Sequence, residues 1–248
     1  MSSVHETGHA KNAANFQTLI AHVTGYGASY NPTKTSIQLP NLLLAGAVAN
    51  AAIANLNSLL PSYSNVVAAR EEAFVPLSKL STKIFNSLKA TDAIQQVIDN
   101  AQTNHRKLTG TRASAKLSEE EKQALLAQGK EVNQVSASQQ SYDSKLDSFD
   151  KQIKLLASIP SYAPNEVELQ VVTLQNIYND LQAKNAAVVT QSVPLSAVRI
   201  VRNEALYHPE TGIVALAQDV KNYAKSVFGA SSANYKLIAG IAIRAGKI

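Results

Sequence analysis

The 248-residue sequence contains no cysteine and no tryptophan, a single methionine, and few glycines (10) or prolines (8). The lack of cysteine excludes disulfides and thiolate chemistry. Glycine and proline interrupt helices, so their scarcity beside abundant alanine and leucine favours a helical chain. Apolar residues make up 45% of the sequence, enough to bury a large core. The composition therefore predicts a folded, all-α protein.

The charge balance is mildly basic, with a formal net charge of +5 and a pI near 9.3. This balance favours acidic partners but lacks the strong clustering of cations that marks nucleic-acid-binding proteins. The segment from Met1 to Lys11 is polar and lacks the basic-then-apolar order of a secretion signal. We therefore expect a cytoplasmic protein, and leave release by a non-classical route open.

The longest predicted helix runs from Ser118 to Ile159 and organises the rest of the chain. Ser118 to Glu121 is a capping box, in which a serine and a glutamate satisfy amides of the first turn. Pro160 ends the helix because its ring removes an amide donor. Large side chains recur at steps of three and four residues, as along a helix packed lengthwise: Val132, Val135, Gln139, Tyr142, Leu146, Phe149, Ile153 and Leu156. We expect a rod of roughly 60 Å with partners along this seam.

Shorter helices are predicted on both sides of this rod, from the same apolar periodicity and from capping residues. The first, from about Ala10 to Thr24, has one apolar face: Phe16, Leu19, Ile20 and Val23. A second capping box, Asn165 to Glu168, is expected to start a helix that Pro194 interrupts, whereas Pro61 and Pro76 predict one kinked helix or two. The expected fold is an elongated antiparallel bundle. Its predicted parts are a first helical unit over 1–117, the connecting helix over 118–159 and a second helical unit over 160–248, or a single domain that holds all three.

The two halves of the sequence resemble each other. Phe16 to Pro32 matches Phe149 to Pro164, and Val75 to Ser78 recurs as Val193 to Ser196, each time after an Ala-Ala pair. The offset between matches changes from about 132 to about 118 residues, so the first half holds roughly 14 extra residues, or two heptads. This pattern predicts two pseudo-repeated helical units, although alanine-rich helices also resemble one another by chance.

The longest stretch without charge lies between Lys34 and Arg70. Its several asparagines and Pro61 make it too polar for a comfortable permanent membrane span. We therefore interpret it as a buried helix of the bundle.

The last residues, 235–248, alternate apolar and polar side chains with the period of a strand. A single strand cannot satisfy its own amides, so we expect it to pair with 35–39, with 167–169 or with a neighbouring molecule, unless it is a loosely ordered tail. The candidate interaction residues of this strand are Tyr235, Leu237, Ile241 and Ile243.

The segment His5-Glu6-Thr7-Gly8-His9 matches the H-E-x-x-H pattern of zinc hydrolases, in which two histidines bind zinc and the glutamate activates water. The setting argues against zinc, because the pattern lies at the chain terminus, contains a glycine and has no evident third ligand. We therefore expect a solvated N-terminal segment and no metal site.

The basic residues Arg106, Lys107, Arg112 and Lys116 precede the acidic run that begins at Glu119. No aromatic residues are interleaved for stacking on bases, so a complement to the dipoles of adjoining helices explains the run better than nucleic-acid binding does. No phosphate loop, nucleophile elbow or pair of carboxylates stands out either. We expect no catalytic residue and no cofactor.

Three segments, Lys11 to Phe16, Thr24 to Gly27 and Tyr162 to Asn165, resemble a group of uncharacterised helical proteins of Bacteroidota-type bacteria. This resemblance extends over most of the chain and implies an all-helical fold without indicating an activity. By architecture alone, long helices with an uncharged apolar stretch are also similar to the α-helical pore-forming toxins, a likeness of shape that does not fix function.

The sequence therefore predicts a non-enzymatic structural or interaction protein that self-associates or binds a protein partner. The alternative is a conditional membrane protein of the pore-forming kind, in which the interval from Lys34 to Arg70 leaves the bundle and inserts.

Overall fold

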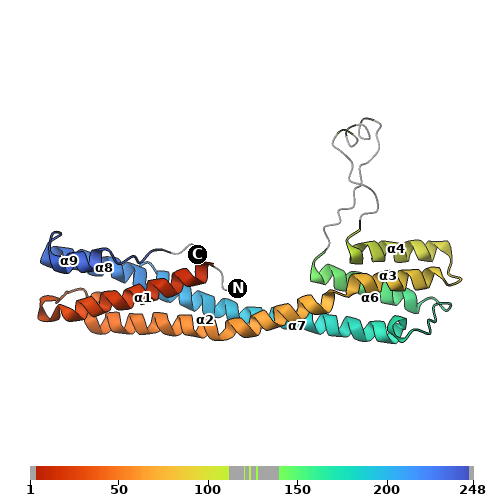
Figure 1. The fold of residues 1–248 in the computed structure, drawn as a ribbon, viewed down its shortest axis with the longest axis horizontal. Helices are drawn as coiled ribbons and strands as arrows, with labels where there is room; N and C mark the ends of the chain where they lie inside the picture. Colours follow the sequence, from red (N-terminus) through yellow and green to blue (C-terminus); the bar gives the residue numbers. More distant parts are fainter. Residues whose placement is uncertain (1–3, 112–119, 121–122, 124–126, 128–139, 246–248) are drawn as a thin grey trace. The chain divides into compact units, whose positions relative to one another are not determined.

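The structure is a computed structural model, and it describes residues 4–111, 120, 123, 127 and 140–245. Every regular element in these ranges is helical and none is a strand, which confirms the predicted all-α fold (Figure 1). The α-helices are α1 (Val4–Gly25), α2 (Leu39–Phe74), α3 (Leu77–Lys89), α4 (Gln95–Thr109), α6 (Tyr142–Ala157), α7 (Val171–Tyr207), α8 (Ile213–Phe228) and α9 (Ala233–Ala239). Three single-turn 3-10 helices accompany them: η1 (Gly27–Ser29), η2 (Thr35–Ile37) and η3 (Val167–Leu169).

The chain forms two compact units that differ from the predicted division at 117 and 159. Unit 1 consists of Met1–Ser64 and Gln191–Ile248, and unit 2 of Asn65–Thr190. The boundaries fall inside α2 and α7, so each of these two long helices contributes residues to both units. Unit 1 therefore combines the first and the last parts of the sequence, which the predicted division placed in separate units.

In unit 1, α8 and α9 pack against α1, and the first part of α2 lies along α1 (Figure 1). Gly46 of α2 faces α1, since a β-carbon there would lie 2.5 Å from the Gln17 side-chain nitrogen and 3.1 Å from the Ile20 side chain. The core contains the predicted stripe of α1 and apolar residues from α2 and α8: Phe16, Leu19, Ile20, Val23, Leu42, Ala49, Leu216 and Val220. Tyr30 closes the turn before α2, where its hydroxyl donates to the Ile37 carbonyl at 2.8 Å.

In unit 2, α3, α4 and α6 pack with the first part of α7. Their buried apolar side chains include Ile84, Leu88, Ala101, Leu108, Leu146, Phe149, Ile153, Leu156, Leu174 and Leu181. Tyr162 closes the turn before α7, and its hydroxyl donates to the Leu169 carbonyl at 3.0 Å. Both tyrosines bond a carbonyl seven residues later, so the two units use the same turn closure.

The predicted continuous helix from Ser118 to Ile159 is wrong at Gln140 and Ser141. Ser141 is extended and caps α6, because its hydroxyl accepts from the Ser144 amide at 3.2 Å, and the helix begins at Tyr142. The predicted seam from Leu146 to Leu156 is buried. Other predicted features lie outside the described residues: Ser118, Glu119 and Glu121 of the capping box, and Val132, Val135 and Gln139 of the seam.

Two further predictions about helix boundaries were wrong. The segment from Asn165 to Glu168 leads into η3 rather than into α7, which begins at Val171 after an extended Gln170. Pro194 does not interrupt α7, and Pro61 likewise lies inside α2. Each proline costs one backbone hydrogen bond, and both are exposed, as are the residues four positions before them, so water can reach the freed carbonyls.

The predicted C-terminal strand is also absent from the described residues. Ser232 caps α9, since its hydroxyl accepts from the Tyr235 amide at 3.1 Å, and Tyr235 to Ala239 is helical. Residues 241–245 continue without regular structure.

Candidate interaction surfaces

The first part of α2 exposes apolar side chains that the core does not use. Leu43, Leu44 and Val48 are 51%, 63% and 48% exposed, and Ala47 and Ala51 lie on the same exposed side of the helix. We call these five residues the α2 outer face. The prediction of a buried bundle helix therefore holds only for the opposite side of α2, which carries Leu42, Ala49, Ala52 and Leu56.

The helical stretch Leu39–Lys89, which comprises α2 and α3, contains the one segment of the described chain that is long and apolar enough to cross a membrane. Its most apolar window has a mean hydropathy of 1.5, and 28% of that window is buried. The sequence from Thr35 to Ala69 carries no charged residue. Length and composition alone are weak evidence for a span, since a core helix passes the same test, but here most of the window is not in a core.

The part of α7 in unit 1 also has an exposed apolar row. Val193, Ile200 and Val201 are 65%, 63% and 56% exposed, and Ala197 lies between them at helical spacing. Single exposed apolar residues need no explanation, but rows along a helix are typical of interaction surfaces.

The four predicted interaction residues of the tail do not form an exposed edge. Tyr235, Ile241 and Ile243 pack against the core of unit 1, and Leu237 is 55% exposed. Ile241 and Ile243 are partly buried while Ala242 and Arg244 are exposed, so the predicted period of two is present over 241–244.

Side chains of unit 1, rather than a second strand, satisfy the backbone of this tail. The Asn12 amide donates to the Arg244 carbonyl at 2.7 Å, and the Arg244 amide donates back to Asn12 Oδ1 at 3.1 Å. Asn15 donates to the Ala242 carbonyl at 2.7 Å, and Lys221 Nζ donates to the Ile241 carbonyl at 2.6 Å. Residues 241–244 thus lie extended along α1 and α8, where burial lowers the pKa of Lys221.

His9, the second histidine of the H-E-x-x-H match, belongs to the same polar cluster. It is 6% exposed, and its Nδ1 lies 2.5 Å from the Tyr207 hydroxyl, which also accepts from Asn12 at 3.4 Å. In the part of the chain that the structure describes, no three histidine or acidic side chains gather where they could hold a metal ion. The expectation of a solvated segment is therefore wrong at His9, which is buried and hydrogen-bonded to Tyr207 in unit 1.

Unit 2 contains a polar cluster that the sequence did not predict. The Arg70 guanidinium lies 3.9 Å from the centre of the Tyr142 ring and donates to Asn185 Oδ1 at 3.2 Å. Asn185, which is 9% exposed, donates to Asp143 at 2.7 Å. These residues are far apart in sequence, so periodicity could not bring them together. The cluster connects α2, α6 and α7 within unit 2.

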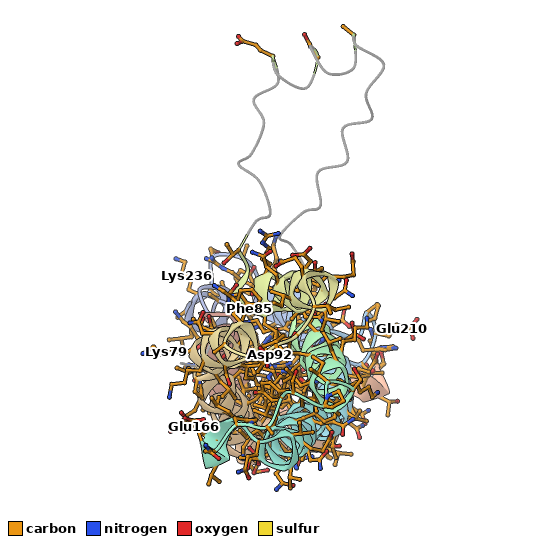
Figure 2. The ribbon with its side chains drawn as sticks, turned by 90° about the vertical axis from the view of Figure 1, so that its right-hand side faces the viewer. Lys79, Phe85, Asp92, Glu166, Glu210 and Lys236 are labelled. Atoms are coloured by element: carbon orange, nitrogen blue, oxygen red, sulfur yellow. The ribbon has the colours of Figure 1, made fainter. Side chains whose placement is uncertain are left out.

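A second polar pair of unit 2 joins α3 to α4. His105 Nδ1 lies 2.8 Å from the hydroxyl of Ser81, which is 1% exposed, and the His105 ring stacks on Phe85 at 5.1 Å. Figure 2 shows Phe85 among the helices of the unit. Burial and the adjacent Arg106 charge lower the pKa of His105, and the contact with Ser81 opposes them. The buried hydroxyl makes this pair a packing contact rather than an accessible nucleophile and base.

An open groove of about 680 Å³ lies on unit 2 between the start of α3 and α7. Apolar residues line its floor, including Leu77, Leu80 and Ile177. The side chains of Lys79, Lys83, Glu168 and Asp180 also line the groove. In Figure 2 the Lys79 side chain projects from the outside of the unit. Charges of both signs surround the groove, so its rim favours neither anionic nor cationic ligands.

The described part of the basic run agrees with its interpretation as a complement to the helix dipole. Arg106 and Lys107 lie in the last turn of α4, and Gly110, with a left-handed φ of 71°, follows the helix as its C-cap. Arg112 and Lys116 lie outside the described residues.

No protein-family model, curated protein or solved structure matches this chain. The resemblances noted from the sequence therefore remain expectations.

Proposed function

We propose that this chain is a non-enzymatic interaction protein that self-associates through the α2 outer face. The observation that carries the proposal is the exposure of Leu43, Leu44 and Val48 on a helix with no charge from Thr35 to Ala69. Complete burial of such a side chain from full exposure contributes about 1.5–3 kcal/mol, and these half-exposed side chains would contribute about half of that each on association. Exposed apolar rows of this kind are typical of protein interfaces.

The absence of charge supports a second copy of the chain as the partner. In a two-fold interface the same patch meets itself, so a charged patch would meet a like charge and be repelled. The α2 outer face avoids this penalty, although the net charge of the chain is +5. Its alanines, Ala47 and Ala51, also permit two helices to approach closely.

We further infer that the two halves of the chain derive from an internal repeat. The paired turn closures of Tyr30 and Tyr162 support it, because each precedes a 3-10 turn and then a long helix. A pseudo-symmetric chain offers similar surfaces twice, which favours assembly.

Analytical ultracentrifugation of the Leu44→Lys variant tests the α2 outer face. Leu44 is 63% exposed, so the lysine leaves the fold intact while placing a charge at the centre of the interface. We expect at least a tenfold weaker self-association than in the wild type. The matched control is Asn57→Lys, which adds the same charge at an exposed polar position of α2. A wild-type chain that stays monomeric at millimolar concentration, or equal effects of the two lysines, would contradict the proposal.

A second candidate function is conditional insertion into membranes. The observation that favours it is the apolar helical window with 28% of its residues buried, in a stretch with a cation at each end, Lys34 and Arg70. Release of a trapped dye from anionic and neutral liposomes, measured from pH 5 to 8, tests it. Insertion predicts release by the wild type and much less by Leu44→Lys. Intact vesicles under all conditions would exclude it.

A further inference from the structure

The groove between α3 and α7 in unit 2 indicates a corresponding surface in unit 1. Leu39 and Val171 begin α2 and α7, and their residue numbers differ by 132, the offset between the first pair of matching segments. Pro76, directly before α3, matches Pro194 of α7 at the second offset, 118. The two helices that form the groove therefore correspond to the first part of α2 and to the last part of α7, both in unit 1.

Burial in the two units agrees with this correspondence. Pairs of residues at these offsets are both at most 2% exposed: Leu42 and Leu174, Ala49 and Leu181, Leu77 and Leu195, and Leu88 and Leu206. Corresponding helices thus turn corresponding faces to the two cores. The faces beside the buried ones correspond as well, because residues three and four apart share a side of a helix.

The rim of the groove is polar in unit 2, whereas its counterpart in unit 1 is apolar. The corresponding pairs are Lys79 and Ala197, Lys83 and Val201, Asn176 and Leu44, and Asp180 and Val48. We call the four residues of unit 1 the α2–α7 surface. Leu44, Val48 and Val201 are 63%, 48% and 56% exposed. Polar side chains keep the rim in unit 2 hydrated, while the equivalent positions in unit 1 expose apolar area as interfaces do.

A contact between two copies needs more area than α2 alone provides. Stable interfaces bury about 800 Å² on each partner, from roughly 20–30 residues, and the α2 outer face has five members. The α2–α7 surface extends this patch onto a second helix. Its four members are uncharged, so the same surface of a second copy can meet it across a two-fold axis without like-charge repulsion.

We propose that the self-association interface spans two helices, with the α2–α7 surface of one copy packed on the same surface of a second copy. This inference rests on the proposed function, because it names the rest of the interface that the α2 outer face begins. Two helices from each copy then pack together, with the side chains of one pair between those of the other. The corresponding groove of unit 2 stays uncovered.

The Val201→Lys variant tests the part of the interface that α7 contributes. It places on unit 1 the residue type that Lys83 supplies at the corresponding position of unit 2. Val201 is 56% exposed, so the fold tolerates the lysine. We expect at least a tenfold weaker self-association by analytical ultracentrifugation. The matched control is Ser196→Lys, which adds the same charge at an exposed position of α7 whose counterpart, Ser78, does not line the groove. Equal effects of the two lysines would overturn the proposal.

The variant Lys83→Ala makes the complementary change in unit 2. It removes a charge from the rim of the groove, and we expect self-association to stay as in the wild type because this groove is not part of the interface. A loss of association as large as that of Val201→Lys would place the contact in unit 2 and overturn the proposal.

Cysteine labelling measures directly whether a second copy covers α7. The chain has no cysteine, so Val201→Cys and Ser196→Cys each supply one thiol for reaction with a maleimide. Labelling of Val201→Cys should slow by about tenfold when about nine-tenths of the copies are associated, while that of Ser196→Cys stays unchanged. A rate at Val201→Cys that does not depend on protein concentration would overturn the proposal.

Comparison with Leu44→Lys separates this inference from the proposed function. If Leu44→Lys weakens self-association and Val201→Lys does not, the interface is confined to α2, so the inference is wrong and the proposed function stands. If the wild type is monomeric, or if neither variant weakens its association, the proposed function and the inference are both wrong.

Discussion

Units 1 and 2 each close the turn before their long helix with a tyrosine-to-carbonyl hydrogen bond. The helix before that turn, α1 or α6, carries different buried side chains in the two units. In α1 the buried stripe is Phe16, Leu19, Ile20 and Val23, and in α6 it is Phe149, Gln152, Ile153 and Leu156. The spacing is identical, so Gln152 takes the position of Leu19. Leu19 is fully buried and Gln152 is 1% exposed, with no hydrogen-bond partner for either amide atom among the described residues.

The difference is that the stripe of α6 holds a polar residue at the position that leucine fills in the stripe of α1. Unit 1 also buries polar side chains, but His9 and Asn12 bond to Tyr207 and to the tail. A buried amide without a partner loses its hydration and gains nothing in return. We therefore expect the α6 stripe to contribute less to the free energy of unfolding than the α1 stripe.

The largest expected effect is that of Leu19→Gln. It places an amide in the well-packed core of unit 1 and removes a leucine that is fully buried. We expect a loss of about 3–5 kcal/mol in the free energy of unfolding, measured by urea denaturation and circular dichroism. A loss below about 1 kcal/mol would show that this position accommodates a buried amide at little cost, and would contradict the expected weakness of the α6 stripe.

The reciprocal change, Gln152→Leu, should stabilise the protein. Leucine has a similar volume and removes the unsatisfied amide, so we expect a gain of about 1–3 kcal/mol in the same measurement. Gln182→Leu, an exposed position on α7 in unit 2, serves as the control and should change the free energy little. Destabilisation by Gln152→Leu would reveal that the amide has a partner, such as a buried water molecule.

The stripes of α1 and α6 have the same spacing of apolar side chains, and this spacing is the part of the comparison that the sequence could predict. Periodicity identified the stripes of α1 and α6, because residues three and four apart share a helix face. It failed at Gln140 and Ser141, where a serine hydroxyl competes for the backbone and starts a new helix. The sequence itself offered this signal, since Ser141 precedes a helical pattern as N-capping residues do.

The tail and the polar clusters could not be predicted in the same way. Residues 241–244 show the period of a strand, but their backbone partners are side chains from α1 and α8. The Arg70, Tyr142 and Asn185 cluster likewise depends on three helices that meet only in the fold. Local periodicity carries no information about such contacts, because it describes one face of one element at a time.

Tyr30→Phe and Tyr162→Phe test whether the two turn closures are equivalent. Each change removes one buried hydroxyl and leaves the carbonyl of Ile37 or Leu169 without that donor. We expect each to cost about 1 kcal/mol in the free energy of unfolding. Two losses that differ by more than about 1 kcal/mol would show that only one closure stabilises its unit.

The same tyrosines predict a loss of stability in alkali. Burial raises the pKa of both hydroxyls, and the nearby Tyr223 raises that of Tyr30 further. The unfolded chain releases these protons near pH 10 while the folded chain retains them, so stability is complete below pH 10 and falls as the pH rises above it. Urea midpoints between pH 9 and 11 should decline in the wild type and decline less in Tyr30→Phe. If the urea midpoint of Tyr30→Phe declined with pH as steeply as that of the wild type, the loss of stability in alkali would come from other groups.

The smallest expected effects come from two exposed ion pairs, one in each unit. Lys34 Nζ lies 2.6 Å from Asp219 in unit 1, and Lys83 Nζ lies 2.8 Å from Glu168 in unit 2. The lysine side chains are 58% and 57% exposed, so water and salt screen both pairs. We expect Lys34→Gln and Lys83→Gln each to cost less than about 0.5 kcal/mol, and the difference to vanish in 0.5 M salt. Since Asp219 is less exposed than Glu168, at 32% against 55%, the effect of Lys34→Gln should be the larger. A loss above about 1 kcal/mol in the free energy of unfolding for Lys83→Gln alone would contradict this order. It would show that an exposed ion pair stabilises unit 2 strongly.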